Sequence, residues 1–200
     1  MIITQTIELD QNINAVWSFF DEIPQVAACI PGAVLTNKIN DNHYDGGVVI
    51  KAGPVKLDFA GYVKVANRDD AKKVLTIDAS GTDEKGRGSA NALLTIALSQ
   101  APKGTKAAIS LDLQISGAAA QFGRGLVSDV TAVLVNQTAN SMKARLTAIA
   151  QGKDPNKVVG TAQEASGIAI ALTSFRRAAA RVFARFFLDR KSTRLNSSHL

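Results

Sequence analysis

The sequence has very little of the chemistry that most catalytic sites use. It contains one cysteine and two histidines in 200 residues, and no CxxC, HExxH, GxSxG or P-loop motif. Zinc, hydrolase and nucleoside-triphosphatase functions therefore lack their characteristic groups. Cys29 is expected to be a small buried hydrophobic residue, and His43 a solvated residue of a polar hairpin turn. We therefore predict no catalytic residue, no metal site and no cofactor in this chain.

Signals for secretion, disulfide bonding and membrane spanning are also missing. A single cysteine cannot form an intrachain disulfide, and it suits a reducing compartment. The N-terminal segment MIITQTIELDQ lacks the basic and apolar regions of a signal peptide, and no stretch of 18 residues is free of charge. With 46% hydrophobic and 20% charged residues, we expect a soluble, globular, cytoplasmic protein.

The net charge of +6 is concentrated near the C-terminus. Residues 1–163 carry 16 Lys and Arg against 15 Asp and Glu, whereas residues 164–200 carry seven against two. A nucleic-acid-binding protein normally carries its basic patch on the folded body. We therefore expect no nucleic-acid binding, and we interpret the C-terminal charge as a separate electrostatic tail.

Alternating hydrophobic residues predict a sheet that ends in one long helix. A first strand precedes a short helix N-capped by Asp10 or Asn12, and six further strands lead to a long helix between Ser116 and Ile149. The expected strands cover residues 2–9, 34–39, 44–50, 55–65, 75–79, 90–98 and 109–115. Short connections favour an antiparallel meander. The expected domain, residues 1–150, is an α+β fold in which a curved antiparallel sheet of about seven strands wraps around the helix.

Small residues recur on the predicted inner face of the sheet. They are Gly46, Gly61, Ala79, Ala90 and Ala92, and they either leave a cavity unfilled or only allow the sheet to bend. The residues expected to line such a cavity are Val48, Phe59, Ile77, Leu94, Leu111, Phe122, Leu126 and Val130. Gln137 and Ser141 fall on the same helical stripe, where they mark either a helix end entering solvent or a polar contact for a ligand.

Two Gly-Arg-Gly clusters interrupt the hydrophobic pattern. Residues 86–88 are most simply the bulged start of a strand. Residues 123–125 fall in the first turns of the predicted long helix, where each Gly costs about 0.5–1 kcal/mol relative to Ala. We interpret this second cluster as close packing of the helix on the sheet, with a pocket mouth as the alternative.

The region after residue 150 divides into three predicted parts. Residues 151–163 are a linker, residues 164–190 a basic amphipathic helix, and residues 191–200, which include His199, resemble a translated sequencing adapter and are regarded as non-native. The helix is expected to lie on a membrane surface, because spanning would bury its arginines. The residues expected to bind the membrane are Phe175, Arg176, Arg177, Arg181, Val182, Phe183, Arg185 and Phe186. Docking on its own domain or on a protein partner is the alternative.

Four short motifs occur in order along residues 1–150. They are ACIPGA at residues 28–33, GPV at 53–55, GRGSA at 86–90, and SG at 116–117 followed by AQFGRG at 120–125. As a set they resemble the carbon monoxide dehydrogenase G-subunit family, within the START-like helix-grip superfamily. The resemblance implies a sheet that grips a long helix around a hydrophobic cavity.

The same resemblance implies a non-enzymatic accessory role beside a molybdenum-containing carbon monoxide dehydrogenase or a related hydroxylase. The molybdenum cofactor would then belong to the partner. Binding of a lipid or a quinone is also implied, together with association with the inner face of the cytoplasmic membrane. The alternative is an enzyme of the polyketide-cyclase kind that acts on an apolar substrate in the same cavity. Such an enzyme needs an acid or base in the cavity, whereas the expected inner rows are apolar.

Overall fold

The computed structural model describes residues 1–52 and 55–157. The predicted basic helix and the tail lie outside the described residues. In chain order the elements are β1 (Ile2–Leu9), α1 (Ile13–Phe19), α2 (Ile23–Ala27), β2 (Ala33–Asn40), β3 (His43–Ala52), β4 (Val55–Asp69), β5 (Val74–Asp83), β6 (Ser89–Ala101), β7 (Gly104–Ile115), the 3-10 helix η1 (Gly117–Phe122) and α3 (Gly123–Ala150).

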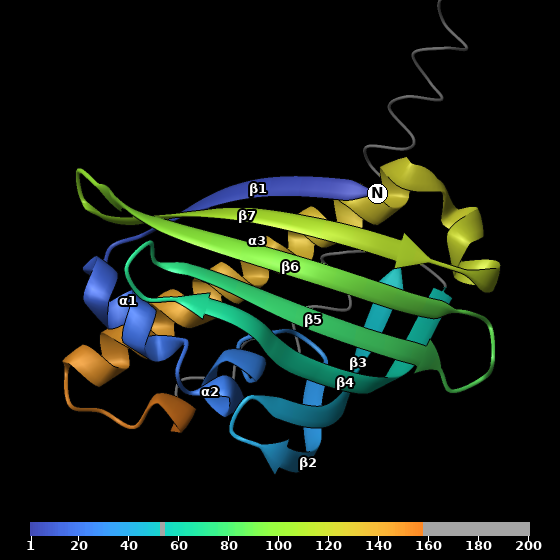
Figure 1. Ribbon diagram of the computed structural model, residues 1–200, viewed down its shortest axis with the longest axis horizontal. Coiled ribbons are helices and arrows are strands. Elements are labelled where there is room, and N and C mark those ends of the chain that lie inside the picture. The colour runs from blue at the N-terminus through green and yellow to red at the C-terminus, as the bar shows by residue number, and fades with distance from the viewer. Residues whose placement is uncertain (53–54, 158–200) are drawn as a thin grey trace, which may run out of the picture.

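The seven strands form one antiparallel sheet in the order β1-β7-β6-β5-β4-β3-β2. After β1 the chain passes through α1 and α2 to the opposite edge of the sheet, and it then returns strand by strand until β7 pairs with β1. The long helix α3 runs along one face of the sheet, with α1 and α2 beside it (Figure 1). This arrangement confirms the predicted α+β fold, in which a curved sheet holds one long helix.

The curvature of the sheet depends on glycine at its centre. A Cβ atom on Gly61 of β4 would lie 1.9 Å from the carbonyl oxygen of Ser80 on β5. A Cβ atom on Gly46 of β3 would lie 2.4 Å from the carbonyl oxygen of Val34 on β2. Only glycine permits these backbone approaches. Gly46 and Gly61 therefore allow the sheet to bend, which is one of the two roles expected for the small inner residues.

The short helix α1 is fixed both at its start and through its buried face. Asn12 Oδ1 accepts a hydrogen bond from the Ala15 N–H at 2.9 Å, which confirms Asn12 as the N-cap. The buried Trp17 donates from its indole Nε1 to Asp70 Oδ1 at 2.7 Å. The guanidinium of Arg68 stacks on the Trp17 ring, 4.1 Å from the centroid. These contacts anchor α1 to the turn between β4 and β5.

Buried apolar side chains form two clusters on the face of the sheet that holds α3. The large cluster joins α1, β5 and β6 to the second half of α3, and its buried members are Leu9, Val16, Trp17, Phe19, Phe20, Cys29, Leu75, Ile77, Ile96, Leu98, Ala107, Met142 and Leu146. The small cluster joins β3 and β4 to η1, and it consists of Leu57, Phe59 and Ala119 with Val48, Ile50, Ala90, Ile115 and Phe122 packed against them. The helix region is therefore held by apolar contacts at both ends.

Several element boundaries differ from the sequence prediction; for example, β5 continues to Asp83 and β7 begins at Gly104. After Ser116 the chain first forms η1, and α3 begins only at Gly123, whose φ of +71° interrupts the regular helix. Strand β4 continues to Asp69, beyond the predicted end at residue 65. Asn67, Arg68 and Asp69 still pair with β5 after a bulge. The prediction failed there because backbone pairing in a strand does not require apolar side chains.

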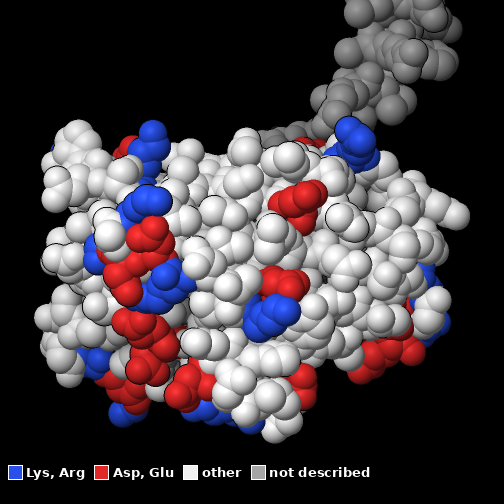
Figure 2. All heavy atoms as spheres, in the orientation of Figure 1, with Lys and Arg blue, Asp and Glu red and all other residues white. Residues whose placement is uncertain are grey.

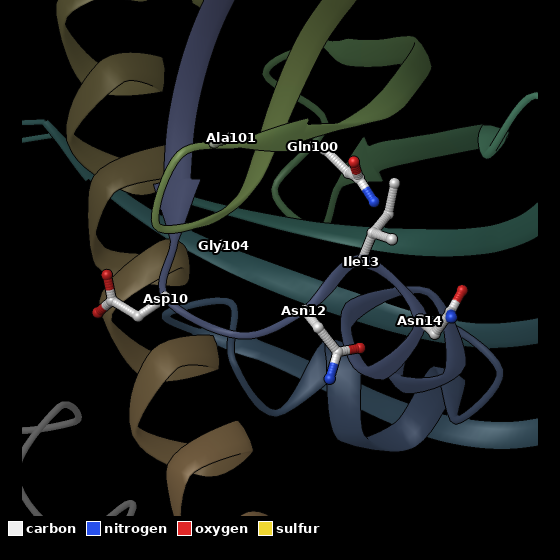
Figure 3. Close-up of a pocket in the computed structure, with 7 residues that line it drawn as sticks. All are labelled: Asp10, Asn12, Ile13, Asn14, Gln100, Ala101 and Gly104. Carbon is white, nitrogen blue, oxygen red and sulfur yellow. The ribbon is translucent and has the colours of Figure 1, made fainter.

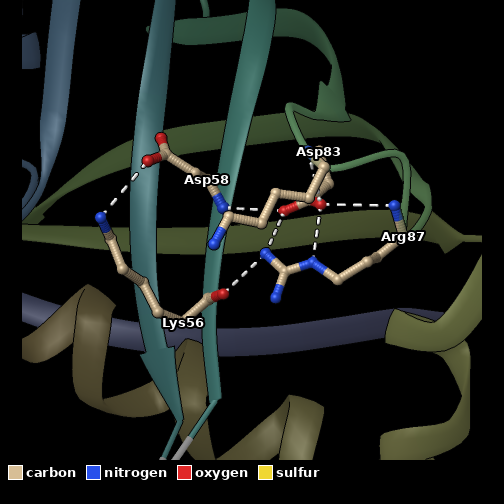
Figure 4. A network of polar contacts seen from close by, with 5 residues as sticks. Lys56, Asp58, Asp83 and Arg87 are labelled. Carbon is tan, nitrogen blue, oxygen red and sulfur yellow. Dashed lines mark hydrogen bonds and ion pairs between the residues drawn. The ribbon is translucent and has the colours of Figure 1, made fainter.

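The end of the sheet near η1 is organised by the buried carboxylate of Asp83. This side chain accepts hydrogen bonds from the Asp58 N–H at 3.0 Å, from Arg87 Nε at 2.8 Å and from Arg87 Nη2 at 2.6 Å. Arg87 Nη2 also donates to the carbonyl of Lys56, so one ion pair connects the β5–β6 turn to β4 (Figure 4). The Arg87 carbonyl in turn accepts from the Ala118 N–H, which positions η1. Hydrogen bonds from Arg87 hold the pKa of Asp83 well below its usual range.

We expect Asp83→Asn to destabilise the fold and to remove part of its acid sensitivity. The pKa of Asp83 is lower in the folded chain than the roughly 3.9 of an unfolded chain. Its contribution to stability is therefore complete above about pH 5 and is lost as the pH falls through the folded-state pKa. Urea denaturation should give a lower midpoint for the variant at pH 7, and a difference from the wild type that shrinks toward pH 3.

Asp41→Asn is the control for this measurement. The Asp41 carboxylate forms a surface ion pair with Lys38 at 2.7 Å, and such exposed pairs contribute little to stability. Its denaturation midpoint should stay close to that of the wild type. Equal midpoints for Asp83→Asn and the wild type at pH 7 would contradict the organising role of Asp83.

Candidate ligand-binding site between the sheet and the long helix

The strand register places a patch of small residues in the middle of the inner face. Ala79 of β5 pairs with Ala92 of β6, and Gly81 pairs with Ala90. Gly81 also pairs with Gly61 of β4, which pairs with Gly46 of β3. Directly paired residues point to the same face of a sheet. These residues, here called the small-residue patch, are Gly46, Gly61, Ala79, Gly81, Ala90 and Ala92. Sequence reasoning missed Gly81, because polar residues surround it and only the register shows its partners.

Large apolar side chains flank the small-residue patch on both sides. On one side, Leu111 of β7, Leu94 of β6 and Ile77 of β5 lie in one row across the sheet. On the other side, Phe59 of β4 pairs with Val48 of β3. The backbone of α3 approaches the sheet most closely along β1, at the edge. The centre of the sheet therefore faces the helix with little side-chain volume between two rows of large residues.

The residues predicted to line a cavity surround this patch. Those in the apolar clusters are Val48, Phe59 and Phe122 in the small one, and Ile77 and Leu94 in the large one. Leu111 lies in the same row as Leu94. On α3, Val130 is buried and Leu126 is partly buried. The strand residues of this set come from β3 to β7, Phe122 lies in η1, and Leu126 and Val130 lie in α3. That they line one cavity and contact a ligand stays a prediction.

A polar stripe runs along α3 beside this region. Gln137, Ser141 and Arg145 follow one another at four-residue intervals, so they lie on one face of the helix. Gln137 and Ser141 are both partly buried, and Gln137 Oε1 is a buried atom without a hydrogen-bond partner among the described residues. The helix continues past them with the buried residues Met142 and Leu146. Gln137 and Ser141 therefore do not mark the point where the helix enters solvent.

Arg145, which sequence reasoning missed, is the most buried member of this stripe. Its side chain is only 2% exposed, and Nη1 donates to Gln25 Oε1 on α2 and to Asn156 Oδ1. The four-residue spacing from Ser141 was the available signal. The burial could not be read from the sequence, because α2 and the segment after α3 cover Arg145 only in the folded chain.

Cys29 lies beside Arg145 and Ser141. Its side chain is buried, and Sγ donates to the Gln25 carbonyl at 3.3 Å, which confirms the expected small buried residue. Burial raises the pKa of the Cys29 thiol, while a hydrogen bond with Ser141 and the charge of Arg145 act in the opposite direction. Because burial dominates, the thiol is neutral at pH 7.

Two open clefts lie elsewhere on the surface. A cleft of about 380 Å³ lies where the β1–α1 connection meets the β6–β7 turn (Figure 3), and it is lined by Asp10, Asn12, Ile13, Asn14, Gln100, Ala101 and Gly104. A second cleft, of about 600 Å³, is lined by Asp21, Glu22, Pro24, Leu35, Thr36, Asn37, Lys38, Asp41 and Tyr44. Neither lining includes a residue predicted to contact the ligand, so neither cleft is the candidate site.

Acidic and basic side chains are interspersed on the face of the molecule shown in Figure 2. They gather toward the end where α1 lies, and a few acidic and basic side chains also lie near the centre of this face. Binding of a nucleic acid needs a basic patch instead.

Within residues 1–52 and 55–157, no three His, Cys, Asp or Glu side chains are placed to share a metal ion. No helix in that part of the chain is long and apolar enough to cross a membrane.

The sequence of the domain matches a known family over most of its length. The sequence model of the G subunit of carbon monoxide dehydrogenase (CoxG) matches residues 6–147. The chain belongs to this family. The matched region contains the small-residue patch and the polar stripe, and it ends before the C-terminal extension. No curated protein matches the sequence.

Solved structures share the fold of this CoxG family member at low sequence identity. A conserved protein from Geobacillus kaustophilus has a TM-score of 0.66 at 19% identity, with 74% of this chain and 95% of that chain covered. A Thermus thermophilus protein has a TM-score of 0.55 at 11% identity, covering 74% and 99%. A START superfamily protein from Mycobacterium smegmatis has a TM-score of 0.51 at 14% identity, covering 74% and 98%. These similarities confirm the START-like helix-grip fold.

The predictions for the two Gly-Arg-Gly clusters differ in outcome: one is confirmed and the other is wrong. Residues 86–88 lead into β6, as expected. Residues 123–125 do not mark close packing of helix on sheet, because a Cβ atom on Gly123 or Gly125 would meet no atom within 4 Å and Arg124 is exposed. That interpretation is therefore wrong. The alternative, an open mouth next to Phe122 of the small cluster, is compatible with the exposed start of α3.

Alanine substitutions of the two glycines should have opposite effects on stability. Gly123→Ala is expected to destabilise the domain by about 1–3 kcal/mol, because φ is +71° and ψ is 155°, a region that L-residues avoid. Gly125→Ala should stabilise it by about 0.5–1 kcal/mol, because alanine favours the helix and its methyl group meets open space. Urea denaturation of both variants measures these differences. Destabilisation by Gly125→Ala would restore the close-packing interpretation.

Proposed function

We propose that this protein is a non-enzymatic accessory protein that binds a hydrophobic ligand, a lipid or a quinone, between the sheet and α3. The observation that carries the proposal is the small-residue patch, which lies on the face that holds α3 and extends from the large cluster to Ala90 at the edge of the small one. Sites for small apolar ligands combine a mostly apolar lining with few polar groups. The rows on either side of the patch supply the apolar lining, and Gln137 and Ser141 supply the polar groups.

The main backbone contact of α3 with the sheet is to β1, whereas the patch lies on β3 to β6. Protein interiors are normally filled to the density of organic crystals. At one end of the patch, Met142 and Leu146 of α3 rest in the large cluster. At the other end, Phe122, the last residue of η1, packs against the small cluster. In the proposed function an apolar molecule lies along this patch, between the large side chains at its two ends.

Gln137 supports a ligand with a polar group near the middle of the helix. A buried oxygen without a partner costs about 1–3 kcal/mol, and Gln137 Oε1 is such an atom among the described residues. A ligand hydroxyl would donate to this oxygen. With the side-chain amide rotated by 180°, its NH₂ group would instead donate to a quinone carbonyl. In this proposal Ser141, one turn further along the helix, offers a second contact.

The ligand space can be tested by filling it. Ala92→Phe is expected to expel a co-purified ligand while the domain stays folded, because the ring would occupy space that the ligand otherwise fills. The measurement is mass spectrometry of organic-solvent extracts, with urea denaturation as the test of folding. Leu93→Phe is the matched control, because the neighbouring Leu93 is 48% exposed on the opposite face of β6.

The two measurements separate a cavity from a solid core. With a cavity, Ala92→Phe loses the ligand, Leu93→Phe keeps it, and both variants unfold near the wild-type midpoint. With a solid core, the extra ring in Ala92→Phe destabilises the domain by about 1–3 kcal/mol, and the wild-type extract contains no specific ligand. That second result would overturn the proposed function.

For the C-terminal extension we propose attachment to the inner surface of the cytoplasmic membrane. Its predicted helix lies outside the described residues, so the proposal rests on the sequence. Insertion of its arginines at the bilayer centre would cost about 2.5–3.5 kcal/mol each. A helix lying flat would instead place Phe175, Phe183 and Phe186 in the interface. Its arginines would then meet anionic headgroups at about 1 kcal/mol per charge.

Removal of the extension should abolish membrane binding. The full chain is expected to co-sediment with vesicles that contain anionic phospholipid, and to bind them less at high salt. A chain truncated after Gln163 should stay in the supernatant under the same conditions. If the truncated chain co-sediments as well as the full chain, the extension is not the anchor.

The family to which the chain belongs supports the choice of partner. Its description names a component of carbon monoxide dehydrogenase, and the proposed partner is accordingly a molybdenum-containing carbon monoxide dehydrogenase or a related hydroxylase. In this role the domain would carry an apolar molecule between the membrane surface and the partner enzyme. The chemistry of oxidation would belong to the partner.

A further inference from the structure

Arg145 is a buried cation without a charged partner in the described part of the chain. Its Nη1 group bonds only to the neutral amide oxygens of Gln25 and Asn156. None of the ion pairs that the described residues form includes Arg145. Taking a guanidinium out of water without a counter-charge is expensive. A residue that is only 2% exposed in this state therefore marks a place where a negative charge is expected.

The unoccupied edge of the guanidinium has the geometry that a carboxylate requires. Nε is buried and has no hydrogen-bond partner among the described residues. The hydrogen bonds of Arg145 within that part of the chain come from Nη1 alone. Nε and Nη2 form the side of arginine that binds a carboxylate through two parallel hydrogen bonds. The bonds of Nη1 hold the side chain in place and leave this pair of donors available.

The neighbouring groups do not supply the missing charge. Cys29 feels the charge of Arg145, but burial raises the pKa of its thiol, so this residue is neutral at pH 7. Ser141 and Gln25 are neutral side chains. Asp154 is exposed, and its Oδ1 already accepts a hydrogen bond from the Asn156 N–H at 2.9 Å. Among the described residues no neighbouring side chain supplies this charge, which a bound carboxylate would provide.

The polar stripe connects Arg145 to the proposed ligand site. Ser141 lies one helical turn away, about 6 Å along the helix axis, and Gln137 lies one turn further. Both of these residues are only partly buried, and in the proposed function the ligand lies beside them. Val130 lies two turns beyond Gln137 toward the start of α3. An elongated ligand over the small-residue patch would thus place its end next to Ser141 and Arg145.

We infer that the ligand is a single-chain amphiphile with a carboxylate head, which pairs with Arg145 beside Ser141 while its alkyl chain lies over the small-residue patch. The inference rests on the proposed function and narrows it, because it selects an acidic lipid over a quinone. Pairing of this kind replaces an uncompensated buried charge by two charge-assisted hydrogen bonds. A neutral quinone would leave the charge of Arg145 uncompensated.

The experiment compares an acidic probe with its neutral ester. The probes are dansyl-undecanoic acid and its methyl ester, titrated by fluorescence into the delipidated full chain. The wild type should bind the acid about tenfold more tightly than the ester. Arg145→Met should lose this preference and keep its affinity for the ester within about threefold, because methionine preserves the apolar stem. Arg124→Met, which removes an exposed arginine of the same helix, is the matched control and should retain the preference.

The outcomes separate this inference from the proposed function. If the wild type binds neither probe, both fail. If it binds acid and ester equally, or if Arg145→Met keeps the preference for the acid, only the acidic-lipid inference is overturned. Butyrate should not displace the acidic probe, whereas palmitate should; displacement by butyrate at the same concentration would indicate a small-acid site and overturn the inference. Arg145→Lys keeps the positive charge but lacks the two parallel N–H donors of the guanidinium, so it should retain part of the preference for the acid over the ester. This variant provides the test if Arg145→Met does not fold.

Discussion

The central physical constraint in this protein is that one helix must cover the inner face of a seven-stranded sheet. A single helix is about 10 Å wide, so it cannot fill such a face by itself. The fold meets this constraint by packing the helix region through large side chains at two places, the large and the small cluster. Between them the sheet presents glycine and alanine, and the site proposed for the ligand follows from that division.

Each end of the domain is secured by a polar network outside the proposed ligand space. At one end, the ion pair of Asp83 and Arg87 connects β4, the β5–β6 turn and η1. At the other end, Trp17 of α1 is held by Arg68 and Asp70. Because both networks are built from groups within the domain, the middle of the inner face does not have to contribute as much to stability. A ligand could therefore enter and leave this region without disassembly of the ends.

The polar stripe of α3 gives the otherwise apolar site its chemical character. Gln137 carries an oxygen without a partner, and Arg145 carries a charge without a counter-ion, in each case among the described residues. In the proposed function this stripe orients the ligand along the helix, with a polar end near Arg145 and an apolar end near the small cluster. The Cys29 thiol beside it is neutral at pH 7, because burial raises its pKa.

The sequence alone determined the class of the fold and limited the N-cap of α1 to Asp10 or Asn12, because strand alternation and helix capping are local properties of the chain. The family was also recognisable from its short motifs. Only the tertiary structure decided which residues meet. The strand register places Gly81 in the small-residue patch. Open space around Gly125 contradicts the close-packing interpretation of residues 123–125. Arg145 is buried because α2 covers it. These features depend on contacts between segments far apart in the chain, and no local pattern encodes such contacts.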